Sequence, residues 1–231
     1  MDGLDVRAED GVLLHVAVAG AGADVLVLSG GPGYLHYLAD EALAPRGARS
    51  WFPDPRGVGR SAGGPHGLTQ AVADLEAIRR ATGVDRWTVL GHSWGGDLAV
   101  RYALDHPESV ARVVSVAGTG VQRDASWTAA YRAGRAAEVA VPVAYVPEVH
   151  RVLTESYLAW IHRPDLLRRL ADCPAPMSFV AAGEDIRPPW PLQQLAALLP
   201  AGRFVVAPDV PHNFWLTHPR TWVEVVSDLV R

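Results

Sequence analysis

The sequence has 231 residues, 49% of them hydrophobic, and this length suits one sizeable α/β domain better than two. The formal net charge is −4 and the basic residues are scattered singly or in pairs, which argues against nucleic acid as a partner. The single cysteine, Cys173, excludes an intrachain disulfide, a cysteine-based zinc site and a redox pair, and we expect neither a metal nor a cofactor.

The chain starts with MDGLDVRAEDG, which is acidic where a secretory signal would be basic and then apolar. No uninterrupted apolar run approaches the roughly 18 residues of a membrane span. We therefore expect a cytoplasmic protein that acts on a small-molecule substrate and contacts no membrane. The oligomeric state is left open, with a slight preference for a monomer, because apolar helices on the surface cover a pocket or meet another subunit equally well.

Short apolar runs rich in β-branched residues recur with helix-like segments between them, a pattern typical of a mostly parallel twisted sheet flanked by helices. The predicted strands cover residues 12–18, 24–29, 49–52, 86–91, 110–117, 177–182 and 203–208. Between them, residues 69–83 place Val72, Leu75 and Ile78 on one stripe and stop at Gly83, as an amphipathic helix does. The predicted fold class is α/β.

The strand pattern lapses between about residues 120 and 172, and this stretch is helix-like instead. The predicted helices cover residues 124–138, 147–162 and 164–172, with a last helix over 219–231. We interpret residues 120–172 as a small helical lid inserted into a core made of residues 1–119 and 173–231. The proline-rich 173-CPAPM-177 marks the return of the chain to the sheet.

Residues 91–95, Gly-His-Ser-Trp-Gly, fit the pattern G-x-S-x-G, with a predicted strand before them and a helix start after them. This context predicts a strained turn that presents the hydroxyl of Ser93 above the sheet edge as a nucleophile. Such a turn needs small neighbours, and Gly91, Gly95 and Gly96 provide them. The alternative is an ordinary glycine-rich turn whose serine caps the helix.

A serine hydroxyl is a weak nucleophile, so it needs a base within hydrogen-bonding reach and a third group that orients this base. Of the nine histidines, His212 follows the last predicted strand on a loop before the final helix, where the base of an elbow-type hydrolase lies. His218 suits the start of the final helix, and His92 alternates away from Ser93. We predict His212 as the base and interpret the other six, His15, His36, His66, His106, His150 and His162, as surface or packing residues.

The acid is predicted from 179-FVAAGEDIRPP-189, where a strand ends in a glycine and two carboxylates follow at the carboxyl edge of the sheet. We assign this role to Asp185 rather than Glu184. The segment also fits a polar turn in which Asp185 pairs with Arg187 or caps the next helix, and Asp209 is a competing carboxylate.

Acyl transfer also needs hydrogen-bond donors for the oxyanion of its tetrahedral intermediate. One predicted donor is the backbone N–H of Trp94, at the helix start after Ser93. The second should come from the loop that follows the strand at residues 24–29, where SGGPG offers bare backbone. Because Pro32 has no N–H, Gly31 is the predicted donor, and a plain glycine turn is the alternative.

Five motifs in this order resemble the α/β-hydrolase fold, and within it the proline iminopeptidase-like serine hydrolases. They are 29-SGGPG-33, 54-DPRGVGRS-61, 91-GHSWGG-96, 183-GEDIRP-188 and 211-PHNFW-215. The resemblance covers about residues 10–118 and 176–231. It implies a nucleophile–base–acid set of Ser93, His212 and Asp185, oxyanion donors at Gly31 and Trp94, and an architectural turn over residues 54–61.

Three features depart from the family pattern. Ser29 stands where the oxyanion loop commonly begins with His, the acid loop is often one residue longer between its Gly and Asp, and the lid is shorter than in proline iminopeptidases. An aminopeptidase must hold a charged amino terminus, typically through lid carboxylates. Glu138, Glu148 and Glu155 are available for this, and each also fits a solvated helix face.

The predicted lid also carries aromatic residues that would line an apolar pocket for an acyl or ring-bearing substrate. They are Trp127, Tyr131, Tyr157 and Trp160, and packing of the lid on the core is the alternative interpretation. The sequence thus predicts a cofactor-independent serine hydrolase that cleaves an ester, thioester, lactone or amide through an acyl-enzyme on Ser93. A lyase or cyclase of small-molecule metabolism and a catalytically silent binding protein are the alternatives.

Overall fold

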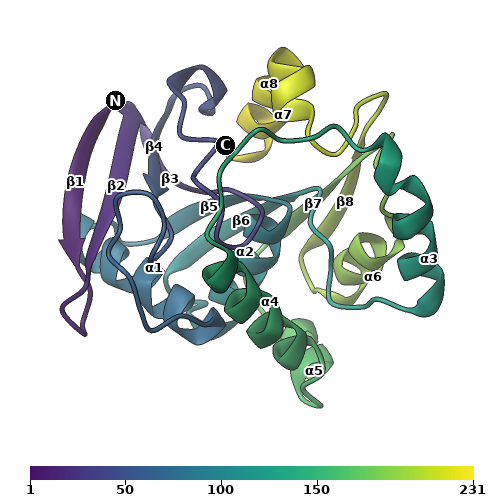
Figure 1. The fold of residues 1–231 in the computed structure, drawn as a ribbon, viewed down its shortest axis with the longest axis horizontal. Coiled ribbons are helices and arrows are strands. Elements are labelled where there is room, and N and C mark those ends of the chain that lie inside the picture. The colour runs from purple at the N-terminus through teal and green to yellow at the C-terminus, as the bar shows by residue number, and fades with distance from the viewer.

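A computed structural model describes residues 1–231 and contains one eight-stranded sheet in the order β1-β2-β4-β3-β5-β6-β7-β8 (Figure 1). The strands are β1 (Asp2–Arg7), β2 (Leu13–Gly20), β3 (Ala23–Leu28), β4 (Ala48–Pro53), β5 (Trp87–His92), β6 (Val110–Val116), β7 (Met177–Ala182) and β8 (Gly202–Ala207). β2 runs antiparallel to β1 and β4, whereas all other neighbours are parallel. This mostly parallel sheet confirms the predicted α/β class.

Every predicted strand is present, and the predicted ends differ from the observed ones by at most two residues. The central strands β3, β5, β6 and β7 bury nearly all their side chains, as expected for strands covered on both faces. The sequence did not predict β1. Val6 is its one buried side chain, and the strand pairs with β2 along one edge only.

Helices cover both faces of the sheet, and each face has its own hydrophobic core, one of 39 and one of 22 buried residues. The helices are α1 (Leu68–Thr82), α2 (Trp94–Asp105), α3 (Ala125–Gly134), α4 (Pro147–Ile161), α5 (Leu166–Ala171), α6 (Trp190–Leu198), α7 (Phe214–Thr217) and α8 (Pro219–Leu229), with short 3-10 helices η1 (Glu41–Leu43) and η2 (Arg135–Ala137). Figure 1 shows α7 and α8 on the opposite side of the sheet from α1, α2 and α6. None of these helices combines the length and apolar character that a membrane crossing requires.

The helices α3, η2, α4 and α5 all lie between β6 and β7, in the stretch predicted as a lid. Helix α4 is integrated with the rest of the protein, because Val149, Leu153, Tyr157 and Trp160 belong to the larger hydrophobic core. The segment before α4 is also hydrogen-bonded to the loop after β3, where Val146 N–H donates to the carbonyl of Gly33 at 2.8 Å. The division into core and lid therefore stays a prediction.

The order in which the chain adds strands to the sheet reverses at β3. From β3 the chain passes to β4 on one side, and through α1 it reaches β5 on the other side. Ligands bind at such a switch point, outside the carboxyl ends of parallel strands. Leu28, the last residue of β3, pairs with Gly91 near the end of β5, so the loops after both strands emerge side by side.

Candidate active site

Ser93 occupies the turn between β5 and α2, with φ of 53° and ψ of −126°. A non-glycine residue in this region costs about 1–3 kcal/mol of backbone strain, so the surroundings must hold it there. The Ser93 N–H is fixed by the carbonyl of Val116 at 2.8 Å. The side chain makes no capping bond to α2, so the alternative of a simple helix cap does not apply.

The glycines around Ser93 are required for steric reasons. A Cβ atom on Gly91 would lie closer than 3.0 Å to the Gly95 carbonyl, and one on Gly95 would collide with the carbonyls of Leu28 and Ser29. Real Cβ atoms essentially never come closer than 3.0 Å to another heavy atom. β5, α2 and the loop after β3 can therefore meet at this corner only because these positions lack side chains.

Ser93, His212 and Asp185 form one hydrogen-bonded line. His212 Nε2 is 3.1 Å from Ser93 Oγ, and His212 Nδ1 is 2.6 Å from Asp185 Oδ2. An ionised carboxylate only accepts, so His212 donates from Nδ1, which leaves Nε2 free to accept the proton of Ser93. The His212 ring is buried, with 6% of its side chain exposed. The structure thus brings together the three residues that the sequence singled out.

Asp185 also contacts Arg187, the partner proposed in the alternative interpretation. Its Oδ1 accepts from the backbone N–H and the guanidinium of Arg187, both at 3.0 Å. Burial alone would raise the pKa of Asp185, but the hydrogen bond from His212 and the charge of Arg187 lower it. The carboxylate therefore stays ionised against His212. Glu184 and Asp209, the competing carboxylates, are exposed.

His92, which the sequence predicted to point away from Ser93, holds the backbone of His212. It is fully buried, its Nε2 lies 2.9 Å from the His212 carbonyl, and its Nδ1 lies 2.7 Å from the Tyr37 hydroxyl. The Tyr37 hydroxyl in turn accepts from the N–H of Gly30 at 2.6 Å. One hydrogen-bonded chain therefore links the loop after β3 to the loop that carries His212.

The two predicted oxyanion donors face the same cleft as Ser93. Gly31 has φ of 63°, in the region that favours glycine, and its N–H makes no hydrogen bond within the protein. Trp94 is the first residue of α2, so its N–H has no carbonyl partner inside the helix. The N–H of Gly30 is already bound to Tyr37, whereas that of Gly31, which lines the cleft, is unbonded.

A cleft of about 1350 Å³ opens above these groups, between the carboxyl edge of the sheet and the residues that precede β7. Trp127, Tyr131 and Tyr157 line it, as predicted, and Trp127 stacks on Tyr131 with 5.6 Å between ring centroids. Trp160 does not line it, which corrects the expectation for this residue. This residue is 3% exposed and packs in the larger core, with the Arg101 guanidinium 5.4 Å from the centroid of its ring.

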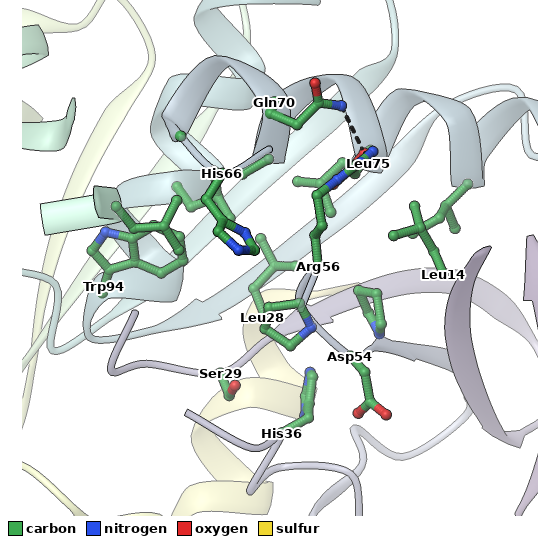
Figure 2. Close-up of a pocket in the computed structure, with 18 residues that line it drawn as sticks. Leu14, Leu28, Ser29, His36, Asp54, Arg56, His66, Gln70, Leu75 and Trp94 are labelled. Carbon is green, nitrogen blue, oxygen red and sulfur yellow. Dashed lines mark hydrogen bonds and ion pairs between the residues drawn. The ribbon is translucent and has the colours of Figure 1, made fainter. Parts of the chain in front are cut away.

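A second, smaller cavity of about 60 Å³ lies beside Trp94, which lines both cavities (Figure 2). Figure 2 shows Arg56 among the residues that line it, and none of the three residues of the hydrogen-bonded line borders it. The Arg56 guanidinium binds the carboxylates of Asp74 at 2.5 Å and Asp10 at 2.7 Å. Residues 54–61 thus form a turn locked by ion pairs, in keeping with an architectural role.

The three glutamates that were considered as binding groups for the amino terminus of a peptide substrate form ion pairs with arginines of the protein. Glu138 lines the cleft but forms an ion pair with Arg187 at 2.7 Å. Glu148 and Glu155 lie outside the cleft on an exposed face of α4, and both bind Arg151 at 2.8 Å. No group of three or more His, Cys, Asp or Glu side chains is arranged to hold a metal ion.

Sequence comparison finds matches to hydrolases. The family model described as alpha/beta hydrolase fold matches residues 25–170. A proline iminopeptidase of Xylella fastidiosa is 41% identical over 100 residues, which cover 40% of this chain and 31% of that protein. The chain thus spans about a third of the length of the proline iminopeptidases it matches. The putative carbamate hydrolase RutD of Caulobacter segnis is 28% identical over 88% of this chain and 90% of its own.

Solved structures resemble the whole chain. A hydrolase from Pseudomonas aeruginosa PA01 superposes with a TM-score of 0.75 at 22% identity, covering 99% of this chain and 98% of the other. A proline iminopeptidase of Mycobacterium smegmatis gives 0.71 at 22% identity, covering 99% and 97%. An esterase of Exiguobacterium antarcticum gives 0.74 at 19% identity, covering 99% of each chain. At such identities the likeness establishes the fold alone.

Proposed function

The chain belongs to the alpha/beta hydrolase fold family, and from that premise we propose that it is a serine hydrolase that acts by acyl transfer through Ser93. One observation carries the proposal: the buried line from Ser93 Oγ through His212 to Asp185, with distances of 3.1 Å and 2.6 Å. Each member has the partner that its role requires, and the strained turn presents the hydroxyl to the cleft.

In the proposed reaction Ser93 Oγ attacks the substrate carbonyl while its proton passes to His212 Nε2. The ionised Asp185 stabilises the imidazolium that forms and keeps the ring in place. The N–H groups of Gly31 and Trp94 bind the oxyanion of the tetrahedral intermediate, and removing one such donor typically costs about 3 kcal/mol.

The intermediate collapses when His212 returns the proton to the leaving alcohol, thiol or amine, and the acyl group stays on Ser93. A water molecule then gives its proton to His212 and attacks the acyl-enzyme. The second tetrahedral intermediate collapses when His212 gives this proton to Ser93 Oγ, which breaks the bond between Ser93 and the acyl group, releases the acid and regenerates the Ser93 hydroxyl. No further group takes part in the proton transfers, because the Asp185–His212 pair completes each of them.

We propose that the substrates are small-molecule esters rather than peptides with an amino-terminal proline. Proline iminopeptidases are among the relatives, but the match covers only 40% of this chain. A peptide amino terminus is a cation and needs a free carboxylate near the nucleophile. Glu138 is neutralised by Arg187, and Glu148 and Glu155 lie outside the cleft.

Labelling with a fluorophosphonate probe tests the proposal, combined with hydrolysis of para-nitrophenyl esters and prolyl para-nitroanilide. We expect the probe to modify Ser93 and the esters to be cleaved faster than the anilide. Ser93→Ala should abolish labelling and lower ester turnover by about 10⁵- to 10⁶-fold. Ser126→Ala, which removes an exposed hydroxyl on α3, is the matched control and should behave as the wild type.

Two results would overturn the proposal. Turnover that survives in Ser93→Ala would point to a lyase or cyclase that uses the same cleft without an acyl-enzyme. Intact labelling of Ser93→Ala at another residue would place the nucleophile elsewhere.

A further inference from the structure

We propose that the cleft takes an ester whose acyl part ends in a carboxylate, and that Arg123 binds this carboxylate. The inference rests on the proposed hydrolase function and adds a substrate class to it. Arg123 lies between β6 and α3, and it lines the cleft together with Ser93.

The carboxylates of the cleft are already engaged with the protein. Those that line it are Asp97, Asp124 and Glu138. Glu138 is paired with Arg187, and Asp124 caps α3 by accepting from the N–H of Trp127 at 2.8 Å. Asp97 is buried and accepts from the backbone N–H groups of Thr119 at 2.9 Å and Gly120 at 3.1 Å. These carboxylates are therefore poorly placed to bind a cationic substrate.

The guanidinium groups of the cleft are in the opposite situation. Four arginines line it: Arg123, Arg132, Arg135 and Arg187. Of these, only Arg187 forms an ion pair with a carboxylate. Arginine stays charged at all relevant pH values, so three cations in the cleft form no direct ion pair, and Arg123 acts on Asp97 only across the Thr119 hydroxyl. The lining has these four arginines against three carboxylates, so its net charge is positive by one, and because field lines concentrate in a cleft this charge favours an anionic substrate.

Arg123 differs from the other two free arginines because its side chain is held in place. Its guanidinium carbon lies 5.2 Å from the centroid of the Trp127 ring and 5.5 Å from that of Tyr157. One guanidinium nitrogen, Nη2, lies 2.6 Å from the Thr119 hydroxyl. A guanidinium carries five N–H donors in a planar fork, so donors remain for a bidentate bond to a carboxylate.

The position of Arg123 relative to Ser93 follows from a short series of contacts. Thr119 binds Asp97 through its N–H and its hydroxyl, and the N–H of Asp97 lies 3.3 Å from the Ser93 carbonyl. Arg123 thus sits on the wall of the cleft beside the start of α2. A substrate whose carbonyl is attacked by Ser93 would extend a flexible acyl chain along Trp127 and place its carboxylate at Arg123.

The test compares kcat/KM for two substrates that differ in one charge: the mono-para-nitrophenyl ester of adipic acid and the methyl ester of that compound. We expect the wild type to favour the anionic ester, after correction for their spontaneous hydrolysis. Arg123→Met keeps the length and apolar stacking but removes the charge. It should lower kcat/KM for the anionic ester by about 10- to 100-fold, as expected for hydrogen bonds between charged groups. The neutral ester should change less than about twofold.

Arg220→Met is the matched control, because Arg220 is an exposed residue of α8 outside the cleft. It should leave both rates unchanged. Equal rates for the two esters in the wild type, or an equal loss for both in Arg123→Met, would overturn this inference while the hydrolase proposal stands. Failure of the wild type to cleave either ester would overturn both.

Discussion

The ring of His92 holds the backbone of His212: His92 Nε2 donates to the His212 carbonyl oxygen at 2.9 Å. A carbonyl only accepts, so this nitrogen carries the proton, and His92 Nδ1 accepts from the Tyr37 hydroxyl at 2.7 Å. Burial lowers the pKa of His92 to about 3, helped by the nearby His212, so the ring is neutral and this pattern is fixed. We infer that His92 is a positioning residue for His212.

The first prediction follows from this contact. His92→Phe keeps the size of the ring but releases the His212 carbonyl, so the loop that carries His212 should shift. Displacement of a reacting group by about 1 Å costs on the order of 100-fold in rate, so kcat for ester hydrolysis should fall by about 10- to 100-fold. KM should stay nearly unchanged, because His92 does not line the cleft.

His36→Phe is the control for this variant. His36 is also buried, and its Nε2 donates to a backbone carbonyl, that of Val27 at 2.8 Å, but it contacts no member of the hydrogen-bonded line. Both substitutions leave one buried carbonyl unpaired, at a cost of about 1–3 kcal/mol of stability, and His92→Phe in addition leaves the Tyr37 hydroxyl without its acceptor. Equal losses of kcat in the two variants would show that His92 acts through stability alone.

The sequence was informative about Ser93, His212 and Asp185 because local rules place all three. Each follows a predicted parallel strand, and the carboxyl ends of parallel strands share one edge of the sheet. His92 was not predictable in the same way. Alternation along β5 correctly turns its side chain away from Ser93, but only the fold shows that the chain returns beneath it 120 residues later.

Other errors have the same origin in contacts distant along the chain. β1 was missed because half of its residues are charged and most are exposed, and it is ordered by pairing with β2. Trp160 was expected in the pocket because it is an aromatic residue of the predicted lid, and the sequence does not tell the two buried sides of α4 apart. Tyr157 faces the cleft, whereas Trp160 faces the core and Arg101. Which charged side chains form ion pairs also depends on tertiary contacts. The sequence therefore did not show that the guanidinium of Arg123 forms no ion pair.

The second prediction concerns the close approach at Gly95. Gly95→Ala would place a Cβ against the carbonyls of Leu28 and Ser29, and neither backbone group can move without displacing β3 or its loop. Overpacking typically costs about 1–3 kcal/mol, and here it acts directly on the turn of Ser93. We expect lower stability in urea unfolding and almost complete loss of reaction with a fluorophosphonate probe.

Gly63→Ala is the matched variant for Gly95→Ala. A Cβ on Gly63 would meet only the Cα of Gly57 at 3.8 Å, an ordinary contact, and the backbone there does not have a positive φ. Its stability should stay within about 0.5 kcal/mol of the wild type, as for most surface changes. A Gly95→Ala protein that reacts with the probe as fast as Gly63→Ala would contradict the steric argument.

The third prediction separates a buried ion-pair cluster from an exposed one. Arg56 and Arg151 each bind two carboxylates, but the Arg56 side chain is 4% exposed and that of Arg151 is 55% exposed. Arg56→Leu leaves the buried carboxylate of Asp74 without its cation, which should cost about 3–5 kcal/mol. Arg151→Leu should cost less than about 1 kcal/mol. Similar shifts of the urea midpoint in both variants would contradict this assignment.

The last prediction concerns Asp97, whose carboxylate holds the loop after β6 through Thr119 and Gly120. Burial raises the pKa of Asp97 from 3.8 to about 6, because desolvation outweighs the hydrogen bonds from Thr119 and Gly120 and the charge of Arg123. Between these two values the folded protein binds more protons at this site than the unfolded chain does. Stability contributed by Asp97 is therefore present below about pH 4 and is lost as the pH rises to about 6.

Asp97→Asn removes the titration but keeps nearly the same shape. Its free energy of unfolding should match that of the wild type near pH 4 and exceed it by about 3 kcal/mol above pH 6, since each pKa unit corresponds to about 1.4 kcal/mol. Urea unfolding of both proteins from pH 4 to pH 7 measures the difference directly, and groups that titrate alike in both cancel. A difference in the free energy of unfolding that stays constant across this range would contradict the prediction, because it would mean that Asp97 does not titrate there. The hydrogen bonds to the Asp97 carboxylate would then stabilise its ionised form more than burial destabilises it.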